Sequence, residues 1–365
     1  MSDNDFPVLG SKESRRRPDK NAKPFQYQPQ VNVHRPVQGV APVPAPVHVP
    51  APVPVHVPAV GAPPLAVVAK PAPAPGAPMA RYPSIIDIGA NLADKSFERD
   101  LQSILQRSTD KGVNHIIITG TSIRSSQRAL ELIANIAKNN VVGAPKLYCT
   151  AGVHPHEAER APRTTISDIR SMVTNNPGVV VSLGECGLDF NRNFSSHESQ
   201  CNMFRSQIEL AIELKMPLFI HERDAHQKFM EIVSKYTSTG TMPKSVIHCF
   251  TGTEQEAAVY LAAGFYFGFT GVITQGSRGD TLRKILRSKT IPLSRVMIET
   301  DCPYMTPHNI DPKDKPKPQA GSKHLRNEPA FLTCVLSTLA ECYGITVQEA
   351  ALQTTNTTRE FFGLP

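Results

Sequence analysis

The chain has 365 residues, a formal net charge of +7 and 33 prolines, 18 of which lie in residues 1–80. Residues 1–80 carry 8 Lys and Arg against 4 Asp and Glu, and the rest carries 31 against 28, which excludes a strongly positive nucleic-acid-binding field over the larger part. No apolar run approaches the roughly 20 residues of a membrane helix and the first residues lack signal-peptide features, so we expect a cytoplasmic or nuclear protein that is neither membrane-spanning nor secreted.

Residues 1–80 form the first predicted region, a disordered tail rich in Pro, Val and Ala. Between Arg35 and Pro78, proline alternates with Val, Ala and His, as in APVPAPVHVP at residues 41–50. Proline removes backbone donors and small neighbours bury little area, so we expect an extended polyproline II chain. Two roles stay open for this tail: a spacer, and a ligand for an SH3 or WW-type domain.

From Ser84 onward, short β-branched runs alternate with amphipathic stretches, which predicts strands alternating with helices. The predicted strands are Ser84–Ile88, His115–Thr119, Leu147–Gly152, Val179–Gly184, Leu218–His221, Ser245–Phe250, Phe265–Phe269 and Val296–Glu299. The predicted helices include Phe97–Lys111, Ser125–Lys138, His197–Lys215 and Ala225–Tyr236, and two closing helices, Pro329–Tyr343 and Thr346–Phe362.

Eight strand and helix units indicate an α/β fold, a (β/α)8 TIM barrel over residues 84–365. Parallel strands need crossover connections, and eight such units close on themselves. The alternative is a doubly wound open sheet, but no GxGxxG motif follows its first strand.

A barrel places its active site at the carboxyl ends of its strands, and polar residues stand there repeatedly in this sequence. These residues are Asp87, His154, His156, Glu185, His221, Glu222, Arg223, Asp224, His248 and Asp301. Histidines and carboxylates that converge without cysteine are typical ligands of a catalytic divalent-metal site with open positions for water and substrate. The sequence therefore predicts a metal centre at the mouth of the barrel.

The same segments resemble the TatD family of metal-dependent deoxyribonucleases. The resemblance rests on DIGANL (87–92), AGVHPH (151–156), GECGLDFNRNFS (184–195), HERDAH (221–226), HCFTG (248–252), IETDCPYM (298–305) and RNEP (326–329), in order along nearly all of residues 84–365. It implies a TIM barrel that hydrolyses DNA phosphodiesters with a divalent cation, often as a 3′-to-5′ exonuclease preferring single strands.

Carried over position by position, the resemblance implies Glu185, His221, His248 and Asp301 as metal ligands, with Asp301 also a candidate general base. Many family members open with an HxH pair that holds a second metal, and Gly89 and Asn91 occupy those positions here. Asp87 and Asn91, with a substrate phosphate oxygen, are then the candidates for a weak second metal site.

Further roles concern the substrate. His154 is the candidate for contacting the scissile phosphate or protonating the leaving oxygen. Arg192 and Arg223 are the candidate phosphate contacts, with pairing to Asp189 or Asp224 as the alternative. Because the chain has no Trp, base stacking would need rim aromatics, for which the candidates are Phe190, Phe194, Phe250 and Tyr304.

These patterns lead to three functional hypotheses. The first is a deoxyribonuclease of DNA repair or fragmentation that prefers single-stranded DNA. Its expected cofactor is a divalent cation, with Mg²⁺ favoured over Mn²⁺ or Zn²⁺. The second is a metal-dependent amide or ester hydrolase on the same barrel. The third is a non-catalytic protein recruited to partners through its proline-rich tail.

Overall fold

The computed structural model describes residues 84–315 and 325–365, so the predicted tail at residues 1–80, its disorder and its SH3 or WW-type partner lie outside the described residues. The strands are β1 Ile85–Ala90, β2 Val113–Ile118, β3 Lys146–Ala151, β4 Val180–Asp189, β5 Leu218–Arg223, β6 Ser245–Ile247, β7 Tyr266–Phe269 and β8 Val296–Ile298. They form one parallel sheet in the order β1 to β8.

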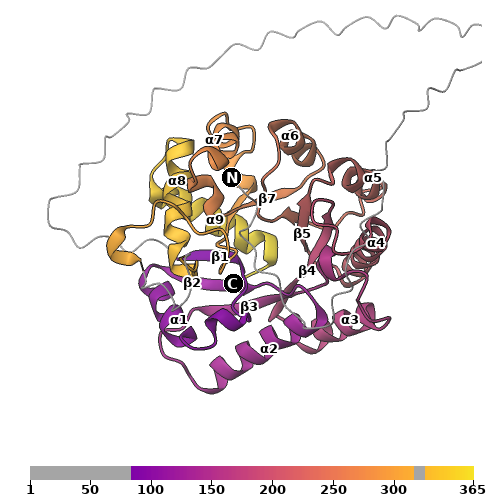
Figure 1. The fold of residues 1–365 in the computed structure, drawn as a ribbon, viewed down its shortest axis with the longest axis horizontal. Helices are drawn as coiled ribbons and strands as arrows, with labels where there is room; N and C mark the ends of the chain where they lie inside the picture. Colours follow the sequence, from indigo (N-terminus) through magenta and orange to yellow (C-terminus); the bar gives the residue numbers. More distant parts are fainter. Residues whose placement is uncertain (1–83, 316–324) are drawn as a thin grey trace, which may run out of the picture. The chain divides into compact units, whose positions relative to one another are not determined.

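The helices alternate with the strands, and Figure 1 shows all but the last of them around the sheet. They are α1 Leu101–Asp110, α2 Ile123–Lys138, α3 Thr165–Asn175, α4 His197–Leu214, α5 His226–Thr237, α6 Glu254–Ala262, α7 Asp280–Arg287, α8 Leu332–Tyr343 and α9 Val347–Phe362. Helices α2, α6 and α9 begin with capping boxes, in which Ser122, Thr253 and Thr346 exchange hydrogen bonds with the third helical residue. The predicted TIM barrel is confirmed.

Side-chain and backbone contacts join the first strand to the end of the last. The Asp301 N–H donates to the Gly89 carbonyl at 2.8 Å, and the Asn91 N–H donates to the Cys302 carbonyl at 2.8 Å. The Asp87 carboxylate accepts two further hydrogen bonds, one from the Thr300 N–H at 2.9 Å and one from the Thr300 hydroxyl at 2.6 Å. These contacts close the barrel next to the predicted site.

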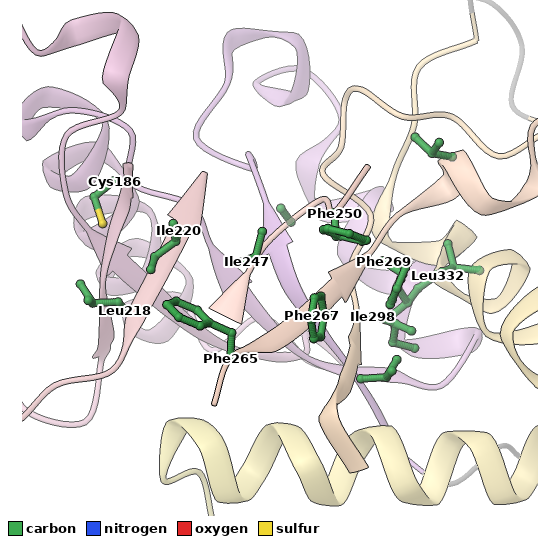
Figure 2. Packing of buried hydrophobic residues seen from close by; sticks show 14 of the residues in the cluster. Cys186, Leu218, Ile220, Ile247, Phe250, Phe265, Phe267, Phe269, Ile298 and Leu332 are labelled. Atoms are coloured by element: carbon green, nitrogen blue, oxygen red, sulfur yellow. The ribbon is translucent and has the colours of Figure 1, made fainter. Parts of the chain in front are cut away.

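Two apolar layers hold the barrel together. The outer layer lies between strands and helices, and Figure 2 shows part of it, including Phe265, Phe267, Phe269 and Leu332. The inner layer takes a side chain from every strand and ends on Phe361 and Phe362, the last two residues of α9, and on Leu364, which follows it. Helix α9 thus covers the amino end of the barrel, where Lys244 donates to the Glu360 carbonyl. The opposite mouth stays available for chemistry.

No single helix among the described residues is long and apolar enough to cross a membrane. Within the described ranges, one bent pair, Pro329–Tyr343 with Val347–Phe362, reaches the required length and apolarity together. Its apolar residues, such as Leu332, Val335 and Leu336, are buried in the outer layer of the barrel.

Candidate active site

Alternation along the strands brings the polar residues of the mouth together. Phe219, Val246 and Met297 belong to the inner layer. His221, His248 and Glu299 each follow one of them by two residues, and side chains two apart along an extended chain share a face. The inner face of the barrel therefore changes from apolar at its base to ionisable at its mouth.

Three imidazoles converge on one oxygen of Glu185, which is 6% exposed. The distances to Glu185 Oε1 are 2.7 Å from His248 Nε2, 3.0 Å from His221 Nδ1 and 3.3 Å from His154 Nε2. Burial would raise the pKa of Glu185, but the surrounding imidazoles lower it well below its ordinary value. The carboxylate is therefore ionised and held among nitrogen donors.

The other ring nitrogens of His221 and His248 face carboxylates. His221 Nε2 lies 3.3 Å from Asp189 Oδ2, and His248 Nδ1 lies 3.5 Å from Glu299 Oε2. A carboxylate partner keeps a proton on the facing nitrogen and leaves the opposite nitrogen with its lone pair. His221 Nδ1 and His248 Nε2, which both point at Glu185, are thereby suited to bind a cation.

His154 has the reverse arrangement. Its Nδ1 accepts a hydrogen bond from the His156 N–H at 3.1 Å, so the proton of the neutral ring sits on Nε2. Burial lowers the pKa of His154 to about 4, and the ring is neutral near pH 7. His154 Nε2 is therefore a hydrogen-bond donor aimed into the site, whereas a metal ligand needs a free lone pair.

The donor set fits a divalent cation. His154, Glu185 and His221 offer ligand-type atoms that all lie within 4.8 Å of one another. Because the proton of the neutral His154 ring sits on Nε2, we assign His248, whose Nε2 lies 2.7 Å from Glu185 Oε1, as the second nitrogen ligand in its place. Burial would lower the pKa of the rings of His221 and His248, but neighbouring carboxylates more than offset this and raise it. A cation would displace those protons from the ligating nitrogens.

The comparison with known proteins decides the family. Residues 86–363 match the family model for TatD related DNase. The chain belongs to the TatD family. The resemblance drawn from its motifs is thus confirmed.

Curated relatives of this TatD protein include two bacterial proteins named 3′-5′ ssDNA/RNA exonuclease TatD. The one from Enterobacter lignolyticus is 39% identical over 280 residues, covering 77% of this chain and 99% of the relative. The one from Escherichia coli K12 is 37% identical over 280 residues, with the same coverage of 77% and 99%.

Solved structures agree with this assignment. A TatD family hydrolase from Entamoeba histolytica has a TM-score of 0.69 at 28% identity, covering 78% of this chain and 100% of that one. A TatD homolog from Escherichia coli K12 has a TM-score of 0.66 at 26% identity, covering 77% of this chain and 99% of that one.

Asp301 of this TatD protein lies at the same mouth. Its backbone has a φ of 51°, a conformation uncommon for residues other than glycine, and its Oδ1 accepts a hydrogen bond from Asn91 Nδ2 at 3.0 Å. Burial raises the pKa of Asp301 to about 7, the range in which a carboxylate exchanges protons near neutral pH. Ligand and general-base roles both remain predictions for Asp301.

Asp87 was a candidate ligand of the weak second metal site, but its carboxylate is turned toward Thr300, just after β8, and away from the inner face of the barrel. Asp87 alternates with Ile86 and Ile88 of the inner layer, so its side chain points to the other face of the strand. It is fully buried, and its carboxylate accepts hydrogen bonds from Thr300 and from the Gly89 N–H at 3.2 Å. We therefore assign Asp87 to barrel closure and Asn91 to orienting Asp301.

Gly89 explains why the first residue of an HxH pair has no place here. A Cβ at position 89 would lie 2.3 Å from Glu299 Oε2 and 3.0 Å from the Phe219 ring. The carboxylate of Glu299 thus fills the space that a side chain at position 89 would need.

The predicted phosphate contacts lie on neighbouring segments of the rim. Arg192 stands in the loop after β4, where its N–H donates to Asp189 Oδ1 at 3.0 Å, and Arg223 is the last residue of β5. The carboxylate of Asp224 accepts from Asn191 Nδ2 at 2.7 Å. Phosphate binding by Arg192 and Arg223 stays a prediction.

Sequence reasoning missed Asp189 and Glu299 as parts of the site. Asp189 Oδ2 lies 2.7 Å from His156 Nε2, in addition to its contact with His221. Burial would raise the pKa of Asp189, but the imidazoles of His156 and His221 lower it well below its ordinary value. Side chains an even number of residues apart along an extended strand share a face. Asp189 is four residues after Glu185 and Glu299 is two before Asp301, so this spacing could have placed both residues in the site.

Proposed function

We propose that this chain is a metal-dependent nuclease that removes nucleotides from the 3′ end of single-stranded DNA. One observation carries the proposal: Glu185, His221 and His248 bring together two imidazole nitrogens and an ionised carboxylate at the mouth of a TatD barrel. The names of the curated relatives support the polarity and the single-stranded substrate.

When bound, a divalent cation would supply an acidified water and would polarise a phosphoryl oxygen. We propose Mg²⁺ as the resident ion, since it commonly serves phosphoryl chemistry through carboxylate ligands. The imidazoles of His221 and His248 also suit Mn²⁺ and Zn²⁺. The residues that would hold the ion are Glu185, His221, His248 and Asp301.

The remaining steps belong to the side chains of the mouth. Asp301, oriented by Asn91, accepts the proton of the attacking water. His154 presents its Nε2–H to a nonbridging phosphate oxygen and stabilises the charge that develops there. Because the His154 ring is neutral near pH 7, this role fits it better than protonation of the leaving oxygen.

The test incubates the purified full chain with 5′-labelled single-stranded DNA, in EDTA or with Mg²⁺, Mn²⁺ or Zn²⁺. We expect metal-dependent shortening from the 3′ end, lost in His221→Ala and in Asp301→Asn with unchanged circular dichroism. A ladder produced equally by both variants would contradict the assigned site. Intact DNA under every metal, with turnover of an amide or ester library, would favour the hydrolase alternative.

A further inference from the structure

An exposed aromatic side chain stands on the rim beside the metal-binding residues. Phe194 is 55% exposed, and it is the one aromatic among the large, exposed apolar side chains of the described residues. The others are Val142, Val259 and Leu352, which lie after α2, in α6 and in α9. None of them shares the loop of Phe194, so this ring is not part of a large apolar patch that would indicate a protein partner.

The other aromatic candidates at the rim are already covered. Phe250 is 3% exposed and packs edge-on against Phe267. The ring of Phe190 is stacked against His197, with centroids 3.6 Å apart. Tyr304 is half-buried beside Asp301, to whose carbonyl its N–H donates at 3.0 Å. Phe194 is therefore the candidate with a ring surface open to a ligand.

Phe194 is connected to the site by a row of rings. Its centroid lies 4.8 Å from that of His156 at an interplanar angle of 72°, and the His156 centroid lies 4.2 Å from that of His154. His154 in turn contacts Glu185. Two ring contacts thus separate Phe194 from His154, whose Nε2–H we assign to the phosphate.

The loop that carries Phe194 is held in place on both sides. Before it, the N–H of Asn191 and that of Arg192 both donate to Asp189 Oδ1 at 3.0 Å. After it, the Ser195 hydroxyl donates to the His156 carbonyl at 2.9 Å and accepts from the Glu159 N–H at 3.1 Å. A fixed ring loses little conformational freedom on binding, which favours its use as a platform.

We propose that Phe194 is a stacking platform for a nucleobase adjoining the scissile phosphate. This inference rests on the proposed nuclease function. Aromatic stacking suits an exonuclease because every base has a π face, so each new terminal nucleotide is held in turn whatever its sequence. The platform also compensates for the weak net charge of the barrel, which cannot hold DNA by its field alone.

The main test compares Phe194→Ala, Phe194→Leu and Phe194→Tyr on three 5′-labelled oligonucleotides with Mn²⁺. One oligonucleotide is intact, and the others carry an abasic residue at the terminal or the penultimate 3′ position. Stacking on an aromatic ring contributes to the binding of each base, so we expect KM for the intact strand to rise about tenfold in the Ala and Leu variants. The Tyr variant should keep wild-type KM, and kcat should change little.

The abasic strands separate stacking from a structural effect. At the position that Phe194 contacts, removing the base should abolish the difference between wild type and Phe194→Ala. An unchanged KM on intact DNA, or an equal rise on all three strands, would overturn the proposal. Leu352→Ala, which removes an equally exposed apolar side chain from α9, is the matched control and should behave as wild type.

A binding measurement keeps this inference separable from the proposed function. Oligonucleotides with 2-aminopurine at either 3′ position are titrated with the full chain in EDTA, where turnover is not required. Stacking should quench the fluorescence with wild type and with Phe194→Tyr, and not with Phe194→Ala. Equal quenching by the wild type and the Ala variant would refute the platform. A wild type that cleaves no strand but shows Phe194-dependent quenching would contradict only the nuclease.

Discussion

Replacement of Glu299 by Gln tests whether this residue controls the metal affinity of His248. Glu299 is fully buried, its Oε1 accepts from the Cys249 N–H, and its Oε2 lies 3.5 Å from His248 Nδ1. Neither Oε2 nor His248 Nδ1 has a hydrogen-bond partner among the described residues, so this longer ion-pair contact is what joins them. The amide of Gln can still accept from Cys249 with its oxygen, but it then turns an NH2 group toward Nδ1–H.

Two donors facing each other favour the tautomer with the proton on Nε2, which removes the lone pair that His248 would offer a cation. Loss of such an outer partner typically costs 10- to 100-fold in metal affinity, which corresponds to about 1.4–2.7 kcal/mol. We therefore expect the Kd for Mn²⁺, measured by isothermal titration calorimetry, to rise by roughly that factor, with unchanged circular dichroism.

Glu222→Gln provides the matched control, since it removes the same charge from a carboxylate that accepts instead from Tyr260 at 2.8 Å and from the Ala225 N–H at 2.9 Å. Its Kd for Mn²⁺ should stay near that of wild type. A folded Glu299→Gln protein that binds Mn²⁺ with wild-type affinity would refute the carboxylate–histidine argument.

His154→Ala should lower kcat about 100-fold while calorimetry shows nearly wild-type Mn²⁺ affinity; a loss of affinity matching that of His221→Ala would instead make His154 a ligand. Glu328→Ala should lower the free energy of unfolding in urea by about 2 kcal/mol, because both oxygens of the buried carboxylate accept from Arg107 at 2.7 Å, and unchanged stability would contradict this. Deletion of residues 1–80 should leave kcat unchanged, and a large decrease would indicate that the tail reaches the active site.

The strands could be predicted because runs such as residues 113–118 bury four of their six side chains and are rich in β-branched residues. The end of β4 was predicted wrongly, at Gly184 instead of Asp189. The strand continues through Gly184 and Gly187, whose φ values are 128° and 134°. A Cβ would lie 2.1 Å from the Phe219 carbonyl oxygen at Gly184 and 1.9 Å from that of His221 at Gly187, so these glycines permit close approach to β5.

The site was predictable to the extent that its residues follow apolar runs. Glu185, His221 and His248 meet as the pattern predicted. The partner of each ring could not be inferred, because the pairing of His221 with Asp189, and of His248 with Glu299, depends on distances between strands. The role of Asp87 was missed for a similar reason, since its partner Thr300 lies 213 residues away in the sequence.

The contacts that close the barrel also order the events of folding. Asp301 and Asn91 meet only when the end of β8 docks beside β1, and this joins residues 210 apart in the sequence. Such long-range contacts form late, because loop closure must precede them. A ribosome-bound chain that still lacks β8 therefore carries Glu185, His221 and His248 without Asp301, and the nuclease gains its complete active site only after β8 has been made and docked.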